Sequence, residues 1–374
     1  MRKALAIAER GRGSTHPNPV VGALVVKGDR VLGSGHHKVA GGPHAEVAAL
    51  DRVGKGARGA TLYVTLEPCC HVGRTGPCTK TILEAGIRRV VVGCLDENPL
   101  VWGRGIAAMR RAGVKVDVGC LKTECRAANR GFFTWIRSGR PLVTLKAAAS
   151  LDGFIAPPKA GRSNGRIHWI TGPRARQAAH ELRRQHDAVL VGAGTVAADD
   201  PRLTVRLPGA AAGPAPLRVV LDGRLSSPPT ARLFRQKGVA PPLVLGADPE
   251  GLAPTLGRTV AAKSRALGRA GAELLWVPSD REGRIPLLKA LEALGQRGVQ
   301  SVLVEGGSLV FGALINARLV DRVAFFLAPT LMGGGIPISA GPGLPPALPL
   351  RFGPLEAQPL SGDILLRADV VAEP

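Results

Sequence analysis

Apolar residues in the first 140 positions follow two spacings, one typical of strands and one typical of helices. Short β-branched runs predict strands at 20–26, 31–36, 60–66 and 90–93. The wider spacing predicts helices at 45–53 and 79–85, and Gly86 gives the second of these a stop signal. Because helices that alternate with strands cover both faces of a sheet, we expect a three-layer α/β domain.

The pattern is interrupted at 137–141, where glycine and proline precede a new apolar run. We expect a domain boundary there, with one domain at 1–140 and a second at 141–374. The second domain has its own predicted strands, at 142–145, 188–191, 218–221 and 301–305. Pro173 suits the first turn of a helix, because proline has no N–H to leave unpaired. The Ala-, Gly- and Pro-rich segment 208–216 predicts a surface loop.

A candidate metal site lies in the first domain. His44 and Glu46 open the helix predicted at 45–53, Pro68-Cys69 follows a predicted strand, and Cys78 comes after eight intervening residues. One histidine and two thiolates give zinc three protein ligands and leave its fourth coordination position open, as in catalytic sites. A carboxylate beside such a site can take a proton from water and pass it to a leaving amine. This order of residues is the signature of zinc deaminases that act on nucleobases.

Other residues near this motif have competing interpretations. A histidine that opens a helix is often a cap, and a single cysteine is usually a buried apolar group. Cys70 and His71 could also bind a metal, but adjacent side chains such as those of Cys69 and Cys70 point apart in most backbones. We expect His71 to line a pocket instead. The remaining cysteines are predicted to be ordinary thiols: Cys94, Cys120 and Cys125.

Charge and composition narrow the class of ligand. The chain has 50 Lys and Arg against 28 Asp and Glu, a formal net charge of +22, which favours phosphate-bearing ligands. The basic residues are scattered, and only 3% of residues are aromatic, so platforms for stacking single-stranded nucleic acid are scarce. We therefore expect anionic small molecules as ligands and no nucleic acid.

Cysteine use and hydropathy indicate a cytoplasmic protein. Six cysteines in 374 residues do not form a disulfide framework, which indicates a reducing compartment. The apolar run at 4–8 ends too early for a secretion signal and predicts a short helix. No apolar run reaches the roughly 18 residues that a membrane span needs, so we expect no membrane partner.

Polar groups in the second domain suggest a ligand site. Gly306-Gly307 joins a predicted strand to a helical run at 308–317, and bare backbone at a helix start can bind a phosphate. Such a turn is also a common structural connection. Three further clusters interrupt the apolar pattern, at 146–153, around Arg183 and at 195–206. They indicate either a nucleotide or sugar-phosphate site, or surface turns and a solvated helix face.

Several of these motifs closely resemble one enzyme family, the bifunctional riboflavin-biosynthesis deaminase/reductases. The matching segments are 15–22, 42–46, 66–78, 146–153, 169–171, 195–201, 203–206 and 304–307. The cysteine spacing is the deciding detail. Nucleoside and tRNA deaminases typically carry Pro-Cys-x-x-Cys, whereas this chain has Val72 three residues after Cys69 and places its second cysteine at Cys78.

The resemblance implies two consecutive activities and two folds. A cytidine-deaminase-like domain would hydrolyse the ring 2-amino group of 2,5-diamino-6-(5-phosphoribosylamino)pyrimidin-4(3H)-one with zinc. A dihydrofolate-reductase-like domain would then use NADPH to reduce the ribosyl group of 5-amino-6-(5-phosphoribosylamino)uracil to ribityl. The partners would be phosphorylated pyrimidine substrates, and we expect a homo-oligomer.

The resemblance also assigns roles to residues in both domains. In the deaminase it implies zinc ligation by His44, Cys69 and Cys78, proton transfer by Glu46, and substrate binding by Asn18, His37, Arg74 and Asn98. In the reductase it implies NADPH contacts from Ala148, Trp169, Thr195, Asp199, Gly307, Ser308, Leu309, Val310, Phe311, Gly312 and Ala313. The implied substrate contacts of the reductase are Ile167, Arg183, Leu203, Arg206 and Glu305. Ile167 departs from the serine that the family usually has, so its side chain lacks the hydroxyl that would form one hydrogen bond.

Two other classes compete with this interpretation. The first is a tRNA or nucleoside deaminase with an unrelated second domain, which the cysteine spacing disfavours. The second is a nucleic-acid-binding protein with a structural zinc ion. The net charge of +22 supports it, but three ligands beside a glutamate favour an open catalytic site.

Overall fold

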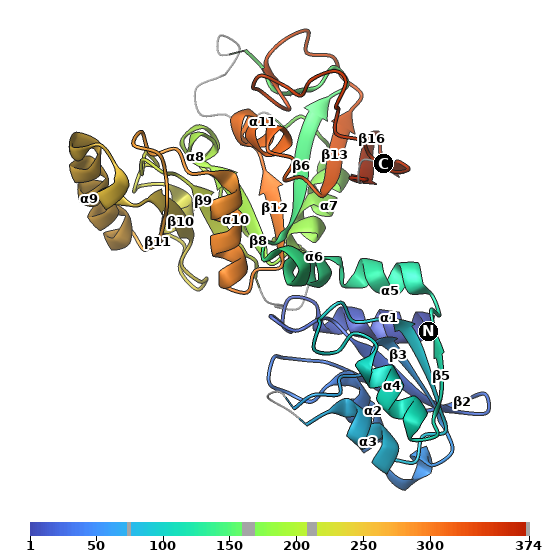
Figure 1. Cartoon of the computed structure of the whole chain (residues 1–374). Coiled ribbons are helices and arrows are strands. Elements are labelled where there is room, and N and C mark those ends of the chain that lie inside the picture. The colour runs from blue at the N-terminus through green and yellow to red at the C-terminus, as the bar shows by residue number, and fades with distance from the viewer. Residues whose placement is uncertain (73–75, 159–168, 208–214, 372–374) are drawn as a thin grey trace. The chain divides into compact units, whose positions relative to one another are not determined.

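The structure is a computed structural model, and it describes residues 1–72, 76–158, 169–207 and 215–371. The chain divides into two compact units, Met1–Gly139 and Arg140–Pro374 (Figure 1). Unit 1 and unit 2 each have a β-sheet of their own and are described separately.

The strands described in unit 1 form a mixed five-stranded sheet in the order β2-β1-β3-β4-β5. β1 pairs antiparallel with β2 and β3, whereas β3, β4 and β5 are parallel. The strands are β1 (Gly22–Lys27), β2 (Arg30–His36), β3 (Thr61–Leu66), β4 (Arg89–Cys94) and β5 (Lys115–Val118). The helices are α1 (Arg2–Ala8), α2 (Ala45–Asp51), α3 (Cys78–Glu84), α4 (Arg104–Arg111), α5 (Lys122–Ala128) and α6 (Arg130–Ser138).

Helices cover both faces of the unit 1 sheet because side chains alternate along each strand. On β1, Ala23 and Val25 pack with Ala45 of α2 in one core. Gly22 faces the other way, where a Cβ would lie 2.0 Å from the Ala4 carbonyl oxygen of α1. Figure 1 shows α1 on one face of the sheet and α2 and α3 on the other. The unit therefore has the expected three layers.

The strands described in unit 2 form a nine-stranded sheet in the order β11-β10-β9-β8-β12-β6-β13-β16-β15. Pairing is parallel from β11 to β13 and antiparallel for β16 and β15. The strands of this sheet are β6 (Leu142–Ser150), β8 (Ala188–Gly192), β9 (Leu217–Leu221), β10 (Leu243–Ala247), β11 (Glu273–Val277), β12 (Ser301–Glu305), β13 (Arg322–Ala328), β15 (Glu356–Leu360) and β16 (Asp363–Asp369). A small second sheet pairs β7 (Phe154–Ala156) with β14 (Ile336–Pro337).

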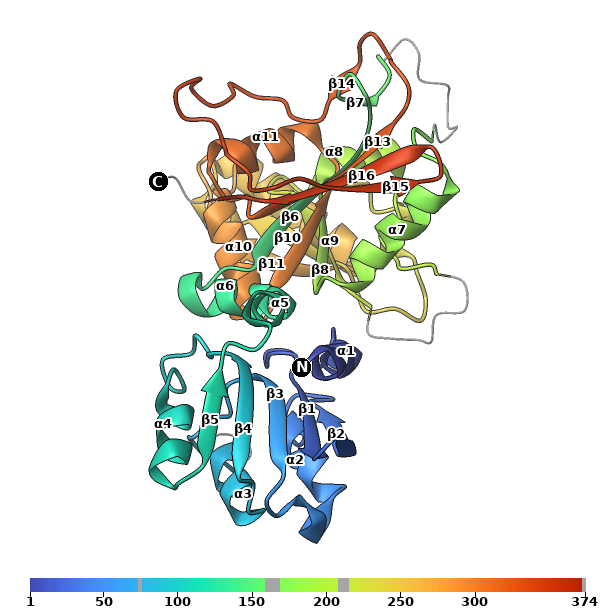
Figure 2. The same cartoon turned by 90° about the vertical axis from the view of Figure 1, so that its right-hand side faces the viewer.

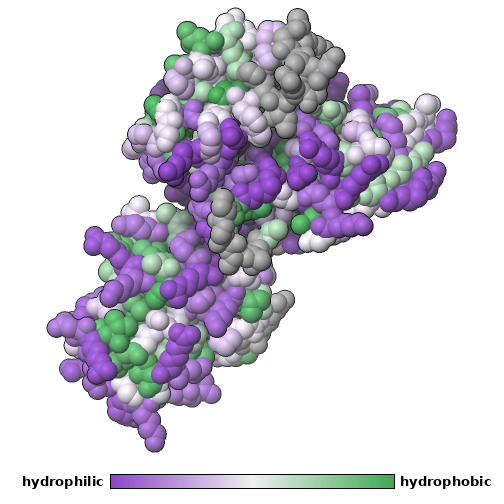
Figure 3. Space-filling model, turned by 180° about the vertical axis from the view of Figure 1, so that it is seen from behind, coloured by the Kyte–Doolittle hydropathy of each residue, from purple (hydrophilic) through white to green (hydrophobic). Residues whose placement is uncertain are grey.

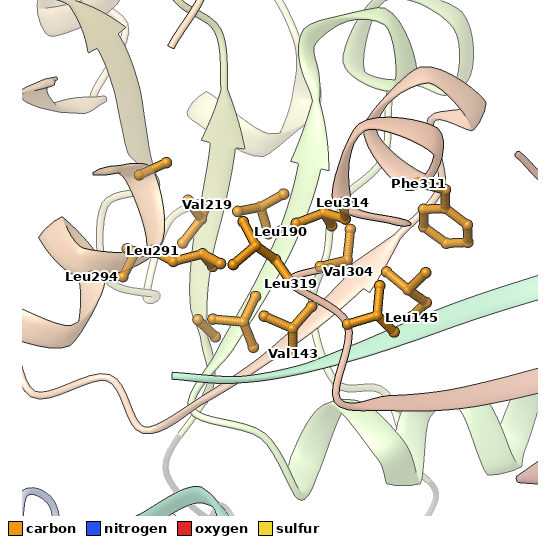
Figure 4. Packing of buried hydrophobic residues seen from close by; sticks show 14 of the residues in the cluster. Val143, Leu145, Leu190, Val219, Leu291, Leu294, Val304, Phe311, Leu314 and Leu319 are labelled. Carbon is orange, nitrogen blue, oxygen red and sulfur yellow. The ribbon is translucent and has the colours of Figure 1, made fainter. Parts of the chain in front are cut away.

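Two cores hold the helices of unit 2 against opposite faces of its sheet. The helices are α7 (Pro173–Arg184), α8 (Ala193–Asp199), α9 (Pro254–Arg269), α10 (Leu287–Gln296) and α11 (Ser308–Asn316). Val304 packs with Leu291 of α10 and Phe311 of α11 (Figure 4), whereas Leu303 packs with Leu182 of α7. Figure 2 shows the sheet between α7 on one side and α10 and α11 on the other.

Most element predictions hold to within two residues. The predicted helix at 45–53 ends at Asp51, and the one predicted at 79–85 begins one residue earlier, at Cys78. Most of the loop predicted at 208–216 lies outside the described residues. Hydrophilic side chains are spread over both units on the face that Figure 3 shows. Among the described helices, none is long and apolar enough to cross a membrane.

Candidate functional site

Three potential zinc ligands meet in unit 1. The donor atoms of His44, Cys69 and Cys78 all lie within 4.8 Å of one another. His44 Nδ1 is 3.1 Å from Cys78 Sγ and 3.4 Å from Cys69 Sγ. Two sulfur donors and one imidazole nitrogen converging from separate segments form the donor set that suits a tetrahedral zinc ion with one open position.

Local structure places each of these three donors. His44 is the residue before α2, Cys78 is the first residue of α3, and Cys69 follows β3. The Cys78 backbone N–H donates to Cys69 Sγ at 3.4 Å. Hydrogen bonds from the Cys78 and His44 side chains outweigh burial and lower the pKa of Cys69 to about 4. A thiolate is the form of cysteine that binds a metal.

Glu46 lies in the first turn of α2 and is 3% exposed. Burial, and then the charge of Cys69, raise the pKa of the Glu46 carboxyl to about 7. A carboxyl group with a pKa near neutrality can both accept and release a proton, which a general acid-base catalyst must do.

Asn18 and His37 lie beside this cluster. His37 is buried and its ring is perpendicular to the His44 ring, with centroids 5.2 Å apart. The His37 Nδ1–H donates to the Pro43 carbonyl at 3.0 Å, so Nε2 accepts from Asn18 Nδ2 at 3.0 Å. Burial lowers the pKa of His37, which favours this neutral form. Asn18 and His37 are therefore fixed in orientation next to the metal ligand His44.

The neighbours of the cysteine motif have other environments. The Cys70 thiol lies 3.9 Å from the Leu100 carbonyl, and Cys70 is not part of the three-ligand cluster. His71 Nδ1 is buried and lacks a hydrogen-bond partner among the described residues, so it is free for a ligand or water. Arg74 lies outside the described residues.

Glu67 is a structural residue of this site that the sequence analysis missed. It is 4% exposed, and its two carboxylate oxygens accept from four backbone N–H groups. These belong to Asp96 at 3.4 Å, Gly103 at 3.0 Å, Gly105 at 3.1 Å and Ile106 at 3.2 Å. A carboxylate directly after a buried strand was the available signal, because a buried charge needs partners.

These bonds tie the Cys69 turn to the loop that carries Asn98. Gly105 packs so closely that a Cβ there would lie 2.1 Å from the Pro68 carbonyl oxygen. Within the loop, Asn98 Oδ1 accepts from the Leu100 N–H at 3.0 Å. The Asn98 backbone N–H in turn donates to Asp96 at 2.9 Å. The position of Asn98 therefore depends on Glu67.

Unit 2 contains a cluster of buried charges at the end of β12. Arg183 of α7 donates to both carboxylate oxygens of Glu305, at 2.5 and 2.8 Å. Lys146 Nζ of β6 is 3.6 Å from the same carboxylate. Burial would raise the pKa of Glu305, but Arg183 and Lys146 outweigh it and lower this pKa to about 2. Glu305 is therefore ionised throughout the neutral range.

The cluster continues to the segment after α8. Arg183 Nη1 donates to the Thr204 carbonyl at 2.8 Å, and the Arg206 N–H donates to His180 Nδ1 at 3.3 Å. Burial, followed by Arg183 and Arg206, lowers the pKa of His180 to about 4, so this histidine is neutral near pH 7. His180 was missed by the sequence analysis. The excess of cations over carboxylates in this cluster favours an anionic ligand.

Leu203 is placed differently from the charged residues. Its side chain is 1% exposed and packs in a core, and its backbone has a φ of 55°, in the left-handed region. Such a conformation is uncommon for a residue other than glycine. Leu203 therefore fixes the path of the chain before Thr204.

The turn between β12 and α11 has the features of a phosphate site. Gly306 and Gly307 have φ of 76° and 88°, and a Cβ on Gly307 would lie 3.4 Å from Thr195 Oγ1. Ser308 starts α11, and its buried hydroxyl has no hydrogen-bond partner among the described residues. An open backbone turn, an unpartnered hydroxyl and the amino end of a helix fit the pyrophosphate of a dinucleotide.

The other candidate cofactor residues divide between surface and core. Ala148 lies on β6, Asp199 ends α8, and Leu309 is exposed. Trp169 is also exposed, with the Arg176 guanidinium 4.7 Å from its ring centroid.

Later residues of α11 are engaged elsewhere. Val310 is half-buried against the first unit 2 core, Phe311 packs inside that core, and Ala313 is exposed. Gly312 faces Ala340, whose carbonyl oxygen would lie 1.7 Å from an added Cβ. The beginning of α11 is therefore better placed for a ligand than Phe311 and Gly312. Ile167 lies outside the described residues.

Two family models match the chain, one for each unit. Residues 1–94 match the cytidine and deoxycytidylate deaminase zinc-binding region. Residues 141–366 match the RibD C-terminal domain. The chain is 43% identical to a riboflavin biosynthesis protein RibD from Bacillus amyloliquefaciens, over 89% of this chain and 85% of that protein. It is 41% identical to the one from Aquifex aeolicus, over 90% of this chain and 88% of that protein.

Solved structures share the whole architecture. RibD from Acinetobacter baumannii superimposes with a TM-score of 0.83 at 36% identity, covering 99% of this chain and 98% of that one. A Thermotoga maritima protein described as a diaminohydroxyphosphoribosylaminopyrimidine deaminase/5-amino-6-(5-phosphoribosylamino)uracil reductase gives a TM-score of 0.82 at 36% identity, over 99% of this chain and 97% of that one. These matches confirm the fold class expected from the sequence. They do not favour a nucleoside or tRNA deaminase with an unrelated second domain.

Proposed function

The chain belongs to the RibD family of bifunctional deaminase/reductases of riboflavin biosynthesis, and we propose that it acts on the two substrates named for the Thermotoga maritima relative. Unit 1 hydrolyses the ring 2-amino group of the diaminopyrimidine phosphate. Unit 2 then reduces the ribosyl group of 5-amino-6-(5-phosphoribosylamino)uracil to ribityl with NADPH. We assign residues 1–140 to the first reaction and 141–374 to the second.

The observation that carries the first assignment is the cluster of His44, Cys69 and Cys78 beside buried Glu46. A zinc ion held by these three residues would lower the pKa of water to near neutrality and act as a Lewis acid. Glu46 takes a proton from the attacking water and delivers it to the departing amino group. The carbon–nitrogen bond breaks, the ring gains a carbonyl oxygen, and ammonia leaves.

The remaining deaminase residues bind and orient the substrate in this proposal. Neutral His37 and its partner Asn18 present fixed polar groups beside His44. Asn98 is held in place through Glu67, and Arg74 suits the substrate phosphate because a guanidinium binds two oxygens at once. His71 Nδ1, which has no hydrogen-bond partner among the described residues, adds a further polar group near the cysteine motif.

In unit 2, NADPH supplies the hydride for reduction of the ribosyl group. Gly307, Ser308 and Thr195 would hold its pyrophosphate, and further contacts are assigned to Ala148, Trp169 and Asp199. Glu305, Arg183 and Arg206 bind the sugar-phosphate substrate. Bidentate pairing with Arg183 keeps Glu305 ionised as a hydrogen-bond acceptor. Ile167 stands where the family usually has serine, and an isoleucine side chain has no group that could donate a hydrogen bond.

The protein is proposed to work in the cytoplasm as a homo-oligomer, with small phosphorylated pyrimidines and no nucleic acid as ligands. All six cysteines lie in the described residues and are free thiols, as in a reducing compartment.

An assay that follows ammonia release and NADPH oxidation on the diaminopyrimidine phosphate tests both assignments. We expect one molecule of NADPH to be oxidised for each ammonia released. Ammonia release without NADPH oxidation, even when the deaminated intermediate is supplied, would overturn the reductase assignment. NADPH oxidation on the intermediate without any ammonia release from the first substrate would overturn the deaminase assignment.

A further inference from the structure

The carboxyl ends of β8, β9 and β12 lie along one edge of the unit 2 sheet, because these strands are parallel and adjacent. The phosphate turn follows β12, and α8 with Thr195 follows β8. The register pairs Gly192 with Leu221, so the turn after β9 comes next along this edge. Ligands of parallel sheets bind at such edges.

The direction of a dinucleotide along this edge follows from the position of Glu305. Glu305 ends β12 and contacts Lys146 of β6, so this part of the substrate cluster lies on the β6 side of the phosphate turn. The nicotinamide must face that cluster. The adenosine half therefore extends the other way, toward the ends of β8 and β9.

An acid at the end of β9 is not available to a ligand. Asp222 follows β9 and is 3% exposed. One carboxylate oxygen accepts from the Ser226 N–H at 2.8 Å and from its hydroxyl at 3.0 Å, and the other accepts from the Ser227 N–H at 2.7 Å. In NAD-binding sites an acid near a strand end binds the ribose 2′-hydroxyl. Asp222 cannot do so while it holds its own turn together.

Two exposed cations stand at the same place. Arg224 is two residues beyond Asp222, and its Nε donates to the Glu282 carbonyl at 2.7 Å. Lys263 of α9 reaches the same turn, with Nζ 3.5 Å from the Arg224 carbonyl. In the part of the chain that the structure describes, neither Arg224 nor Lys263 forms an ion pair with a carboxylate. The turn thus places two positive charges together.

We infer that Arg224, supported by Lys263, binds the 2′-phosphate of NADPH and so makes unit 2 select NADPH over NADH. The inference rests on the proposed reductase function, which requires the cofactor at this edge. The Glu282 carbonyl orients the guanidinium through Nε and leaves its two Nη groups for phosphate oxygens. Lys263 adds a second charge from α9.

Binding of 2′,5′-ADP and of 5′-AMP to the full-length chain tests the inference without turnover. Isothermal titration calorimetry should show that Arg224→Ala weakens 2′,5′-ADP by about 10- to 100-fold and leaves 5′-AMP unchanged. Arg224→Gln should behave in the same way, which shows that loss of charge is responsible. Lys263→Ala should weaken 2′,5′-ADP by about 3- to 10-fold. The matched control is Arg258→Ala, an exposed cation of α9, which should have no effect.

Direct titration of the wild type with NADPH and NADH separates two kinds of failure. If the wild type binds NADPH tightly but Arg224→Ala keeps the wild-type preference for 2′,5′-ADP over 5′-AMP, the inference is overturned. The proposed function then still stands. Equal affinity of the wild type for NADPH and NADH would also overturn the inference and leave the proposed function standing. Binding of neither cofactor would overturn both.

Discussion

The two candidate sites of this chain are held together by opposite means. In unit 1, Glu67 lies two residues before the metal ligand Cys69, and its carboxylate binds backbone N–H groups rather than a cation. In unit 2, the buried carboxylate of Glu305 is held by two cations, Arg183 and Lys146. The first arrangement offers donor atoms for a cation, whereas the second places two cations around one carboxylate and so favours an anion. Loss of one metal ligand should therefore abolish metal binding in unit 1, whereas loss of the shared carboxylate should cost folding stability in unit 2.

The sharpest test of the metal centre is removal of one thiol. Cys78→Ala deletes one of three zinc ligands, so the protein should lose most of its zinc and all deaminase activity, while NADPH oxidation by unit 2 continues. Metal analysis by mass spectrometry measures the first effect. Cys70→Ala is the control, because this thiol lies near the Leu100 carbonyl and outside the ligand cluster. Zinc loss from the control instead would reverse the choice of ligand.

Removing the proton carrier should spare the metal. Glu46→Gln keeps the shape of the buried side chain but cannot transfer protons, so ammonia release should fall by about 10²- to 10⁴-fold with zinc content unchanged. Reduction of the deaminated intermediate should continue at the normal rate. Ammonia release at the wild-type rate would show that another residue carries the proton.

In unit 2 the corresponding change should cost stability. Glu305→Ala leaves two buried cations without their carboxylate, which should lower the free energy of unfolding of unit 2 by about 3–5 kcal/mol. Denaturant unfolding, with a probe for each unit, measures this loss. Glu292→Ala is the control, because its pair with Lys289 lies at the surface of α10. The control should change stability by about 0.5 kcal/mol or less. Equal effects of the two substitutions would contradict the view that the Glu305 carboxylate stabilises unit 2 more than a surface ion pair does.

Glu67 tests whether unit 1 depends on backbone hydrogen bonds. Glu67→Ala leaves four N–H groups without their acceptor and should destabilise unit 1 by about 2–3 kcal/mol. Weaker zinc binding and a higher KM for the deaminase substrate should accompany it, since Cys69 and Asn98 both rely on this carboxylate. Glu67→Gln retains one acceptor oxygen and should recover part of the loss. Full stability and an unchanged KM in Glu67→Ala would mean that the loop carrying Asn98 keeps its conformation without Glu67.

The smallest expected effect is a pH dependence of unit 2. The pKa of His180 is about 4 in the folded chain against an ordinary 6.5, so between these values the unfolded chain binds a proton that the folded chain does not. Stability of unit 2 should therefore fall as the pH drops from 6.5 toward 4. His180→Gln should flatten this slope, as seen in urea midpoints at several pH values. An unchanged slope would assign the pH dependence to another group.

The sequence allowed prediction of those features of the fold and the site that depend on residues close together along the chain. The positions of His44 and Glu46 follow from one helix start, and the cysteine motif from one strand end, so the metal centre could be predicted without coordinates. The fold class followed from the alternation of apolar runs with helical segments. Most boundaries shifted by one or two residues, as at Cys78, because the first turn of a helix carries little apolar pattern, but the strand predicted at 142–145 extends to Ser150.

Contacts across long stretches of sequence could not be predicted in the same way. Glu67 accepts a hydrogen bond from Gly105, which is 38 residues away in the sequence. Arg183 donates to Glu305, which is 122 residues away. No local pattern connects such partners, so the organising role of Glu67 and the neutral state of His180 became visible only in the folded chain. The same holds for Phe311, which the family resemblance places among the NADPH contacts but which packs in the core.

The four backbone amide protons that hydrogen-bond to the Glu67 carboxylate could also report on the state of the metal site. They belong to residues of the loop and of the first turn of α4, well away in sequence from the metal ligands, yet they hydrogen-bond to the side chain two positions before Cys69. If Cys69 moves when zinc is removed, these amides should lose protection against hydrogen exchange together. Nuclear magnetic resonance could then follow metal loading through hydrogen atoms that never contact the metal.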